Sequence, residues 1–308
     1  IDGSTMETAA VTVDPKLMEQ IHYGESGVSV STGNFSRSYT DMDIVSPGFT
    51  VNISRTYNSK DERATSTMGR GWTFGFEGSF KQEGTSTVWV AKLPNGGAQM
   101  FVRSGETYAA NDSRSMLVKN SDGTHTLTTR DQYGYTFNTN GYLSEMKDRN
   151  GNTITIEVDT TGKVRTITDM VGRQFIITYD ATNTLITKVT DVKGNRYVQY
   201  DYDVSKKTLT TVSAITAIGV TSPSAIAAYE YDASNYLAKV KDNAGNVMDD
   251  ATYDHAAGTN QHKVTQHRDP YGNIFRYVYT TDSTGGLTTI TDSNSRVMKK
   301  KFDTAYYV

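Results

Sequence analysis

Histidines are the residues of this chain whose side chains most readily bind a metal ion. The five are His22, His125, His255, His262 and His267. His262 and His267 lie five positions apart, which in a strand would place them on opposite faces of a sheet. Together with His255 they form a conceivable metal cluster, but no carboxylates stand at a ligand spacing beside them. We therefore expect these histidines in surface or loop positions and predict no metal site.

A calcium-binding loop is the second chemistry that the residue spacing suggests. Asp148, Asn150, Asn152 and Asp159 fall at oxygen-ligand positions of an EF-hand-like loop. However, Thr153 stands where that loop needs glycine, and Asp159 is shorter than the usual glutamate. A tight turn explains the same polar residues without an ion. We predict turn structure here and no bound cofactor.

Candidate catalytic groups are scarce. The chain has no cysteine and no Gly-x-Ser-x-Gly nucleophile motif. Carboxylates are plentiful, but turns account for most of them, and nothing singles out the pair that a glycosidase needs. Trp72 and Trp89 could stack on a sugar if exposed in a groove, although their alternating positions favour the core. We predict a protein without catalytic activity.

The overall composition favours a folded, sheet-rich protein. The 308 residues include 20 tyrosines, and aromatic side chains favour strands. The 26 glycines and 5 prolines fit a chain rich in turns. A net charge of −3 argues against a nucleic-acid partner, which needs a basic face. No run approaches the roughly 20 apolar residues of a membrane span.

The start of the chain gives expectations about its origin. The lack of cysteine excludes disulfides within this chain and suits an exported bacterial protein. The chain begins at Ile1 without an initiator methionine or a signal segment, so we expect a mature chain or a fragment. Residues 1–26 predict a lead-in with one short helix, which Asp14 can cap and whose first position suits Pro15.

Residues 27–130 show short strands separated by Gly, Asn and Ser. Alternating segments occur at residues 28–31, 49–53 and 87–90. Residues 94–97 (PNGG) indicate a hairpin turn, because Asn and Gly accept positive φ. We predict an N-terminal β domain over this range.

Residues 131–308 repeat themselves. The unit is an aromatic-rich strand, a turn, a second strand with Leu or Val, and then Asp-x-x-Gly before a third strand. The aspartate accepts hydrogen bonds from the turn backbone, and the glycine takes the left-handed conformation that closes the hairpin. The predicted structural turn residues are Asp148 and Gly151, Asp169 and Gly172, Asp191 and Gly194, Asp242 and Gly245, and Asp269 and Gly272.

Stacking of these units determines the predicted fold. One unit cannot bury its apolar face alone, whereas several side by side can. The gap between Asp191 and Asp242 is about twice the usual spacing, and we interpret residues 208–228 as an eroded copy. We therefore predict an all-β protein: an N-terminal β domain followed by antiparallel hairpin repeats that form a long twisted or spiralling sheet, a partial shell.

The ordered set of units resembles the tyrosine-aspartate (YD) repeats of the Rhs family. The pairs that give the repeats their name are Tyr179-Asp180, Tyr200-Asp201, Tyr231-Asp232 and Tyr253-Asp254. The N-terminal half resembles the domain of unknown function that commonly precedes Rhs repeats. The residues that carry this likeness are 32–35 (TGNF), Pro47, Phe49, 55–59 (RTYNS) and 69–74 (GRGWTF).

The resemblance implies a secreted or cell-surface bacterial protein whose repeats form a hollow β shell. It implies a non-catalytic scaffold, with the C-terminal effector of the parent protein, commonly a toxin, as its partner. Alternatives are an adhesion module that binds a cell-surface glycan or protein, and a secreted polysaccharide-active enzyme. The chain departs from the family in having too few repeats to close a shell. Residues 269–272 (DPYG) superficially resemble the family's self-cleaving core motif, but we interpret them as a repeat turn.

Overall fold

The computed structural model describes residues 27–46, 50–61, 66–94, 96–110, 115–215, 222–282 and 285–302. Within these ranges the protein contains 24 strands and no helix. The predicted all-β class is therefore confirmed. The short helix expected near Asp14 lies outside the described residues.

The strands form two sheets. The small sheet contains β1 (Ser36–Ile44), β2 (Val51–Asn58) and β3 (Trp72–Phe74). The large sheet begins with β4 (Ser79–Gln82), β5 (Val88–Lys92), β6 (Ala98–Ser104), β7 (Thr107–Ala110), β8 (Met116–Lys119) and β9 (His125–Thr128). It continues with β10 (Gly134–Phe137), β11 (Leu143–Lys147), β12 (Thr153–Val158), β13 (Val164–Thr168), β14 (Gln174–Tyr179), β15 (Ile186–Asp191), β16 (Arg196–Asp203) and β17 (Thr208–Ile215). It ends with β18 (Ser224–Tyr231), β19 (Leu237–Asp242), β20 (Val247–Tyr253), β21 (Val264–Arg268), β22 (Ile274–Asp282), β23 (Gly285–Thr291) and β24 (Val297–Phe302).

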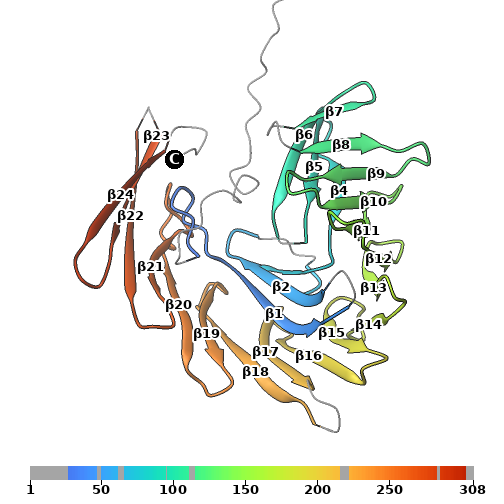
Figure 1. The fold of residues 1–308 in the computed structure, drawn as a ribbon. Helices are drawn as coiled ribbons and strands as arrows, with labels where there is room; N and C mark the ends of the chain where they lie inside the picture. Colours follow the sequence, from blue (N-terminus) through green and yellow to red (C-terminus); the bar gives the residue numbers. More distant parts are fainter. Residues whose placement is uncertain are drawn as a thin grey trace, which may run out of the picture.

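The large sheet is a single antiparallel meander. Each strand from β4 to β24 pairs with the next one along the chain, and no described pairing joins β24 back to β4. Figure 1 shows the resulting open curve, with β1 and β2 on its concave side. The predicted long sheet of antiparallel hairpins is confirmed, and β17 with β18 fills the gap that we interpreted as an eroded copy. The predicted domain boundary near residue 130 falls between the paired strands β9 and β10.

One hydrophobic core joins the two sheets. Alternation along each strand supplies it: Ile154 and Ile156 of β12 are buried, while the residues between and beside them are exposed or half-buried. Trp72 and Phe74 of β3 belong to the same buried cluster. The small sheet therefore fills the concave side of the large one.

The first strand of the large sheet also folds back onto the repeats. The Phe80 amide donates to the Gly141 carbonyl at 2.8 Å, and the Leu143 amide donates to the Gly78 carbonyl at 3.0 Å. The Phe80 ring packs against Phe137, with 5.9 Å between ring centroids. Strands β4–β11 thus curl around a local aromatic centre.

Turns alternate between two edges of the large sheet, because successive strands run in opposite directions. We call the edge with the turns β11–β12, β13–β14, β15–β16, β19–β20 and β21–β22 the Asp-Gly rim. We call the opposite edge, with the turns β10–β11, β12–β13, β14–β15, β16–β17, β18–β19 and β20–β21, the YD rim. Asp148 and Asp159 lie at opposite ends of β12, so they cannot share one calcium ion.

Four of the five turns on the Asp-Gly rim share one hydrogen-bond pattern. Asp148 Oδ1 accepts from the amides of Asn150 at 2.8 Å and Asn152 at 2.9 Å, and Gly151 takes a left-handed φ of 86°. Asn152 Nδ2 donates to the second carboxylate oxygen of Asp148 at 2.7 Å. The same backbone arrangement recurs at Asp169 with Gly172, Asp242 with Gly245, and Asp269 with Gly272.

The turn after Asp191 departs from the predicted register. The left-handed residue is Asn195, with φ of 48°, and not Gly194. Asp191 pairs directly with Arg196 in the ladder, so this loop is one residue longer than the other turns of the rim. The fully buried Asp191 side chain instead binds Arg196 Nη2 at 2.8 Å and the Gly194 amide at 2.9 Å. The predicted role of Gly194 as the left-handed residue is therefore wrong.

We expect Gly151→Val to lower the free energy of unfolding by roughly 1–3 kcal/mol. The reason is backbone strain, because a β-branched residue rarely adopts the left-handed φ found at Gly151. Urea denaturation of the variant and the wild type measures the difference. An unchanged midpoint would contradict this turn geometry.

Candidate functional site

The YD rim carries a β-bulge in every hairpin. At each turn the ladder shifts by one residue, so one residue near the start of the strand after the turn has no partner on the opposite strand. The extra residues are Ser144, Arg165, Thr187, Thr210, Ala238 and Thr265. The residue just before each of them pairs at the shifted register, and we call these six the bulged residues: Leu143, Val164, Ile186, Leu209, Leu237 and Val264. The side chains of the bulged residues lie in the core. The bulges thus leave a row of inward-facing backbone groups along one rim.

Tyrosine hydroxyls from the next repeat donate hydrogen bonds to the carbonyls of this row. The Tyr179 hydroxyl donates to Val164 O at 3.0 Å and that of Tyr202 to Ile186 O at 2.7 Å. Tyr253 bonds Leu237 O at 2.9 Å, and Tyr279 bonds Val264 O at 2.8 Å. Burial raises the pKa of Tyr253 and Tyr279 well above the ordinary value, so both hydroxyls stay protonated and able to donate. Each tyrosine therefore ties its repeat to the one before it.

The N-terminal segment supplies hydrogen-bond acceptors for amides of the same row. Four bulged residues donate to it: Leu143 to Gly78 O at 3.0 Å, Ile186 to Thr67 O at 2.7 Å, Leu237 to the Tyr57 hydroxyl at 3.0 Å, and Val264 to Gly33 O at 2.9 Å. The described parts of the segment from 33 to 78 thus follow the inside of the YD rim in the direction opposite to the repeats. We call this set of contacts the bulge ladder.

One of the predicted tyrosine-aspartate pairs is shifted by two residues. In the β16–β17 hairpin Tyr202 and Asp203 hold the positions that Tyr179 and Asp180 hold in the preceding unit. Tyr200 lies two residues earlier on the same face, where its hydroxyl donates to Asp41 of β1 at 3.0 Å. Both pairs read Tyr-Asp in the sequence, so only the register of the strand separates them.

We expect Tyr253→Phe to lower the free energy of unfolding by about 1–3 kcal/mol, because the change leaves the Leu237 carbonyl buried and unpaired. Tyr271→Phe is the matched control, since Tyr271 is 90% exposed. Urea denaturation measures both changes. Equal midpoints for the two variants would show that the ladder hydroxyl contributes nothing.

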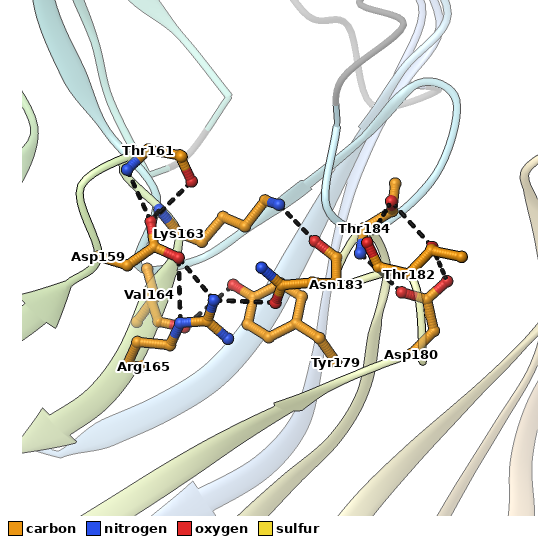
Figure 2. A network of polar contacts seen from close by, with 10 residues as sticks. All are labelled: Asp159, Thr161, Lys163, Val164, Arg165, Tyr179, Asp180, Thr182, Asn183 and Thr184. Carbon is orange, nitrogen blue, oxygen red and sulfur yellow. Dashed lines mark hydrogen bonds and ion pairs between the residues drawn. The ribbon is translucent and has the colours of Figure 1, made fainter.

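Neighbouring YD turns are also joined by side chains. Figure 2 shows Arg165 between the turn at Asp159 and the turn at Asn183. Arg165 Nη2 lies 2.5 Å from Asp159 Oδ2 and 2.8 Å from Asn183 Oδ1, and the guanidinium stands 4.6 Å from the centre of the Tyr179 ring. Lys163 Nζ donates to the Asn183 carbonyl. These contacts fix the spacing of two hairpins.

Asp159 is the most acidic carboxyl of this network. Partial burial would raise its pKa, but hydrogen bonds from Thr161 and Arg165 hold that pKa well below the ordinary range. Its Oδ1 also accepts from the amides of Thr161 at 2.8 Å and Lys163 at 3.1 Å. Asp159 is therefore ionised and fully engaged in the turn.

The lowered pKa of Asp159 makes the stability of the fold depend on pH in the acidic range. Because the folded pKa lies below the unfolded value of about 3.9, the unfolded chain binds the proton first as the pH falls. The stability that Asp159 contributes is complete above about pH 4 and is lost as the pH falls toward the folded pKa. We expect the urea midpoint of Asp159→Asn to decline less between about pH 5 and pH 3 than that of the wild type. Parallel declines would contradict this assignment.

A buried ion pair within the small sheet contacts tyrosines of the large one. Arg55 of β2 binds Asp41 of β1 through two bonds, Nε–Oδ2 at 2.9 Å and Nη2–Oδ1 at 2.8 Å, and both side chains are 1% exposed. The guanidinium lies over the rings of Trp72 at 4.7 Å and Tyr229 at 5.0 Å. Burial would lower the pKa of Arg55, but Asp41 and the tyrosines raise it above normal. We call this group, with Tyr200, the Arg55 cluster.

Asp249 of β20 forms a second junction between the sheets. Its carboxylate accepts from Arg37 Nε and Nη2 at 3.3 Å each and from the Tyr39 hydroxyl at 3.2 Å. His267 Nε2 lies 2.9 Å from the same carboxylate and is fully buried. Neither junction could be predicted from the sequence, because the partners in the two sheets are far apart along the chain and no local spacing identifies them.

The two tryptophans differ in exposure. Trp72 is fully buried and donates its indole N–H to the Tyr231 hydroxyl at 2.9 Å, so it is not available to stack on a ligand. Trp89 is half-buried and stacks on Phe80, with ring centroids 5.0 Å apart. The suggestion of a sugar-stacking role for Trp72 is therefore wrong.

The histidines separate into different environments. His267 belongs to the Asp249 junction and is fully buried in β21, so the expected surface or loop position is wrong for it. His125 lies 3.1 Å from the Tyr108 hydroxyl. His255 and His262 meet in the β20–β21 turn. His22 lies outside the described residues. Over the described ranges no group of three or more His, Cys, Asp and Glu side chains is placed to hold a metal ion.

A pocket of about 640 Å³ lies inside the YD rim, between its first turns and the N-terminal segment. The charged residues that line it are Lys60, Lys81, Lys92, Lys163, Asp61 and Glu77. Lys81 Nζ stands 4.0 Å from the centre of the Tyr142 ring, which also lines the pocket. Four ammonium groups against two carboxylates suit an anionic ligand.

In the described residues no helix is both long enough and apolar enough to cross a membrane.

Comparison with known proteins gives a family match over part of the chain. Residues 25–98 match the model of a domain of unknown function (DUF6531). This range contains the small sheet and the motifs between residues 32 and 74 on which the resemblance to a domain preceding Rhs repeats depends. A search of the curated proteins found no match.

The solved structures that are similar to this chain over most of its length include three crystal structures. TcdB2-TccC3 shows 12% identity and a TM-score of 0.32, with 89% of this chain and 16% of that chain covered. TcdB2-TccC3-TEV shows 12% identity and a TM-score of 0.31, with 86% and 16% covered. TcdB2-TccC3 without its hypervariable C-terminal region shows 10% identity and a TM-score of 0.28, with 89% and 20% covered. This chain therefore spans a sixth to a fifth of the length of those chains, and membership of the Rhs family stays a prediction.

Proposed function

We propose that this chain is a non-catalytic structural scaffold of an exported Rhs/YD-repeat protein, part of a β shell that would enclose or present a C-terminal effector. The bulge ladder is the observation that carries the proposal. It binds amides of four hairpins, spread from β11 to β21, to one segment of the same chain. Such contacts brace a curved wall, because they fix hairpins along the large sheet to one segment on its concave side.

The use of the buried polar groups supports the non-catalytic part of the proposal. A general acid or base must reach the atom that gives or takes the proton. Arg55 and Asp41 bind each other in the core, and His267 binds Asp249 on the neighbouring strand of the large sheet. In turn aspartates such as Asp148, the carboxylate accepts hydrogen bonds from backbone amides. These groups stabilise the fold and leave no free acid–base pair among themselves.

Hydrogen exchange tests the brace. We expect the amides of Leu143, Ile186, Leu237 and Val264 to exchange only through global unfolding, at one common free energy. Tyr57→Phe removes the acceptor of Leu237 alone and should speed exchange there more than at Val264. Exchange of the four amides at unrelated rates, each far below the global free energy, would refute a bracing role.

A binding module for a cell-surface glycan or protein is the second candidate function. The lysine-lined pocket is the observation that favours it, because acidic polysaccharides carry the complementary charge. Tyr142, held beneath Lys81, offers an aromatic face beside those charges.

Titration against neutral and acidic cell-wall polysaccharides separates the candidates. A scaffold alone gives neither saturable binding nor cleavage. Saturable binding of an acidic polymer that is lost in Lys81→Ala, but kept in Lys119→Ala on an exposed strand, would establish the binding module. Turnover abolished by a single carboxylate substitution would establish a polysaccharide-active enzyme and overturn the non-catalytic proposal.

A further inference from the structure

The β20–β21 turn departs from the other turns of the YD rim. In the turns at Asp159 and Asp232 the aspartate amide donates to the carbonyl four residues later, at Lys163 and Tyr236. The Asp254 amide instead donates to Lys263, nine residues later. The longer loop begins with His255 and ends with His262.

The backbone of this loop holds His262 in place. His262 has a φ of 64°, the left-handed position that Asn235 takes, also at 64°, in the preceding YD turn. Its ring stacks on Tyr236, with centroids 4.8 Å apart and planes 19° from parallel. The His255 ring lies 5.3 Å from the same tyrosine. One aromatic side chain therefore orients both imidazoles.

The two imidazoles point the same type of nitrogen at each other. His255 Nδ1 lies 3.1 Å from His262 Nδ1. His255 Nε2 lies 2.8 Å from Asp232 Oδ2, across from the neighbouring turn. The carboxylate accepts the Nε2 hydrogen, so the Nδ1 atom of neutral His255 carries a lone pair toward His262.

We propose that His255 and His262 bind a divalent transition metal ion of the zinc type through their Nδ1 atoms, with Asp232 orienting His255. Two ligands of a tetrahedral zinc ion at about 2.0–2.1 Å stand roughly 3.3 Å apart, close to the spacing of these nitrogens. The ion replaces the hydrogen that lies between the two Nδ1 atoms, and that hydrogen moves to Nε2 of His262. Water completes the coordination, since the His255 and Asp232 side chains are 32% and 24% exposed.

Titration of the untagged chain with zinc chloride by calorimetry tests this site. We expect one saturable ion per chain and a higher melting temperature with zinc. His255→Ala and His262→Asn should abolish both effects, and asparagine keeps the left-handed backbone at position 262. Asp232→Asn preserves the turn acceptor but presents an N–H group to His255, so it should weaken binding about 10–100-fold.

Gln261→Ala, in the same loop, is the control and should bind zinc as the wild type does. Equal zinc affinity in the wild type and in the double variant His255→Ala/His262→Asn would overturn the proposal. So would the absence of saturable binding in the wild type, which would leave the two histidines as a hydrogen-bonded pair only.

Discussion

Arg55→Met should lower the free energy of unfolding by about 3–5 kcal/mol, the largest loss that we expect from a charged residue in this chain. The substitution leaves the Asp41 carboxylate in the core, where only the Tyr200 hydroxyl still binds it. It also removes the cation from the faces of Trp72 and Tyr229. A buried, uncompensated charge is costly because the core cannot replace its hydration. Urea denaturation measures the effect.

A double-mutant cycle separates the ion pair from simple packing. Arg55→Met/Asp41→Leu removes both charges and should recover most of the loss, since apolar pairs of similar volume replace buried ion pairs at little cost. Lys119→Met breaks the exposed pair with Glu106 and should leave the midpoint nearly unchanged. If the double variant is as unstable as Arg55→Met, packing and not charge explains the loss.

Local patterns were sufficient to predict the repeats. Alternating apolar residues such as Ile154 and Ile156 identified strands, and Asp-x-x-Gly identified turns, because both signals are encoded within a few neighbouring positions. These local patterns could not predict the position of the left-handed residue in a turn whose loop differs in length by one residue. Asp191 illustrates this, since its loop is longer by one residue and the left-handed position moves to Asn195.

The bulge ladder and the Arg55 cluster could not be predicted from spacing. Asp41 meets Tyr200, which is 159 positions away, and Tyr57 meets Leu237, which is 180 positions away. Nothing local tells Tyr200 from Tyr202, and only the path of the N-terminal segment along the concave face assigns them different partners. That path is a property of the folded chain, because backbone acceptors such as Gly33 carry no signature in the sequence.

Gly71→Ala is the second substitution for which we expect a large loss, about 2–5 kcal/mol, from two causes that add. Gly71 has a φ of 78°, which an L side chain rarely adopts. A Cβ atom there would also lie 2.5 Å from Cε2 of Tyr57, whose ring is 2% exposed. Tyr57 cannot move without breaking its bond to the Leu237 amide at 3.0 Å, so the strain reaches the bulge ladder.

Gly172→Ala isolates the second cause, because Gly172 has nearly the same φ, 80°, and nothing within 4 Å of the added Cβ atom. We expect that variant to lose only about 1 kcal/mol, from backbone strain. The excess loss in Gly71→Ala then measures the displacement of Tyr57, and faster exchange of the Leu237 amide should accompany it. Equal losses for the two alanine variants would show that Tyr57 yields freely, and that the N-terminal segment does not brace the YD rim at this point.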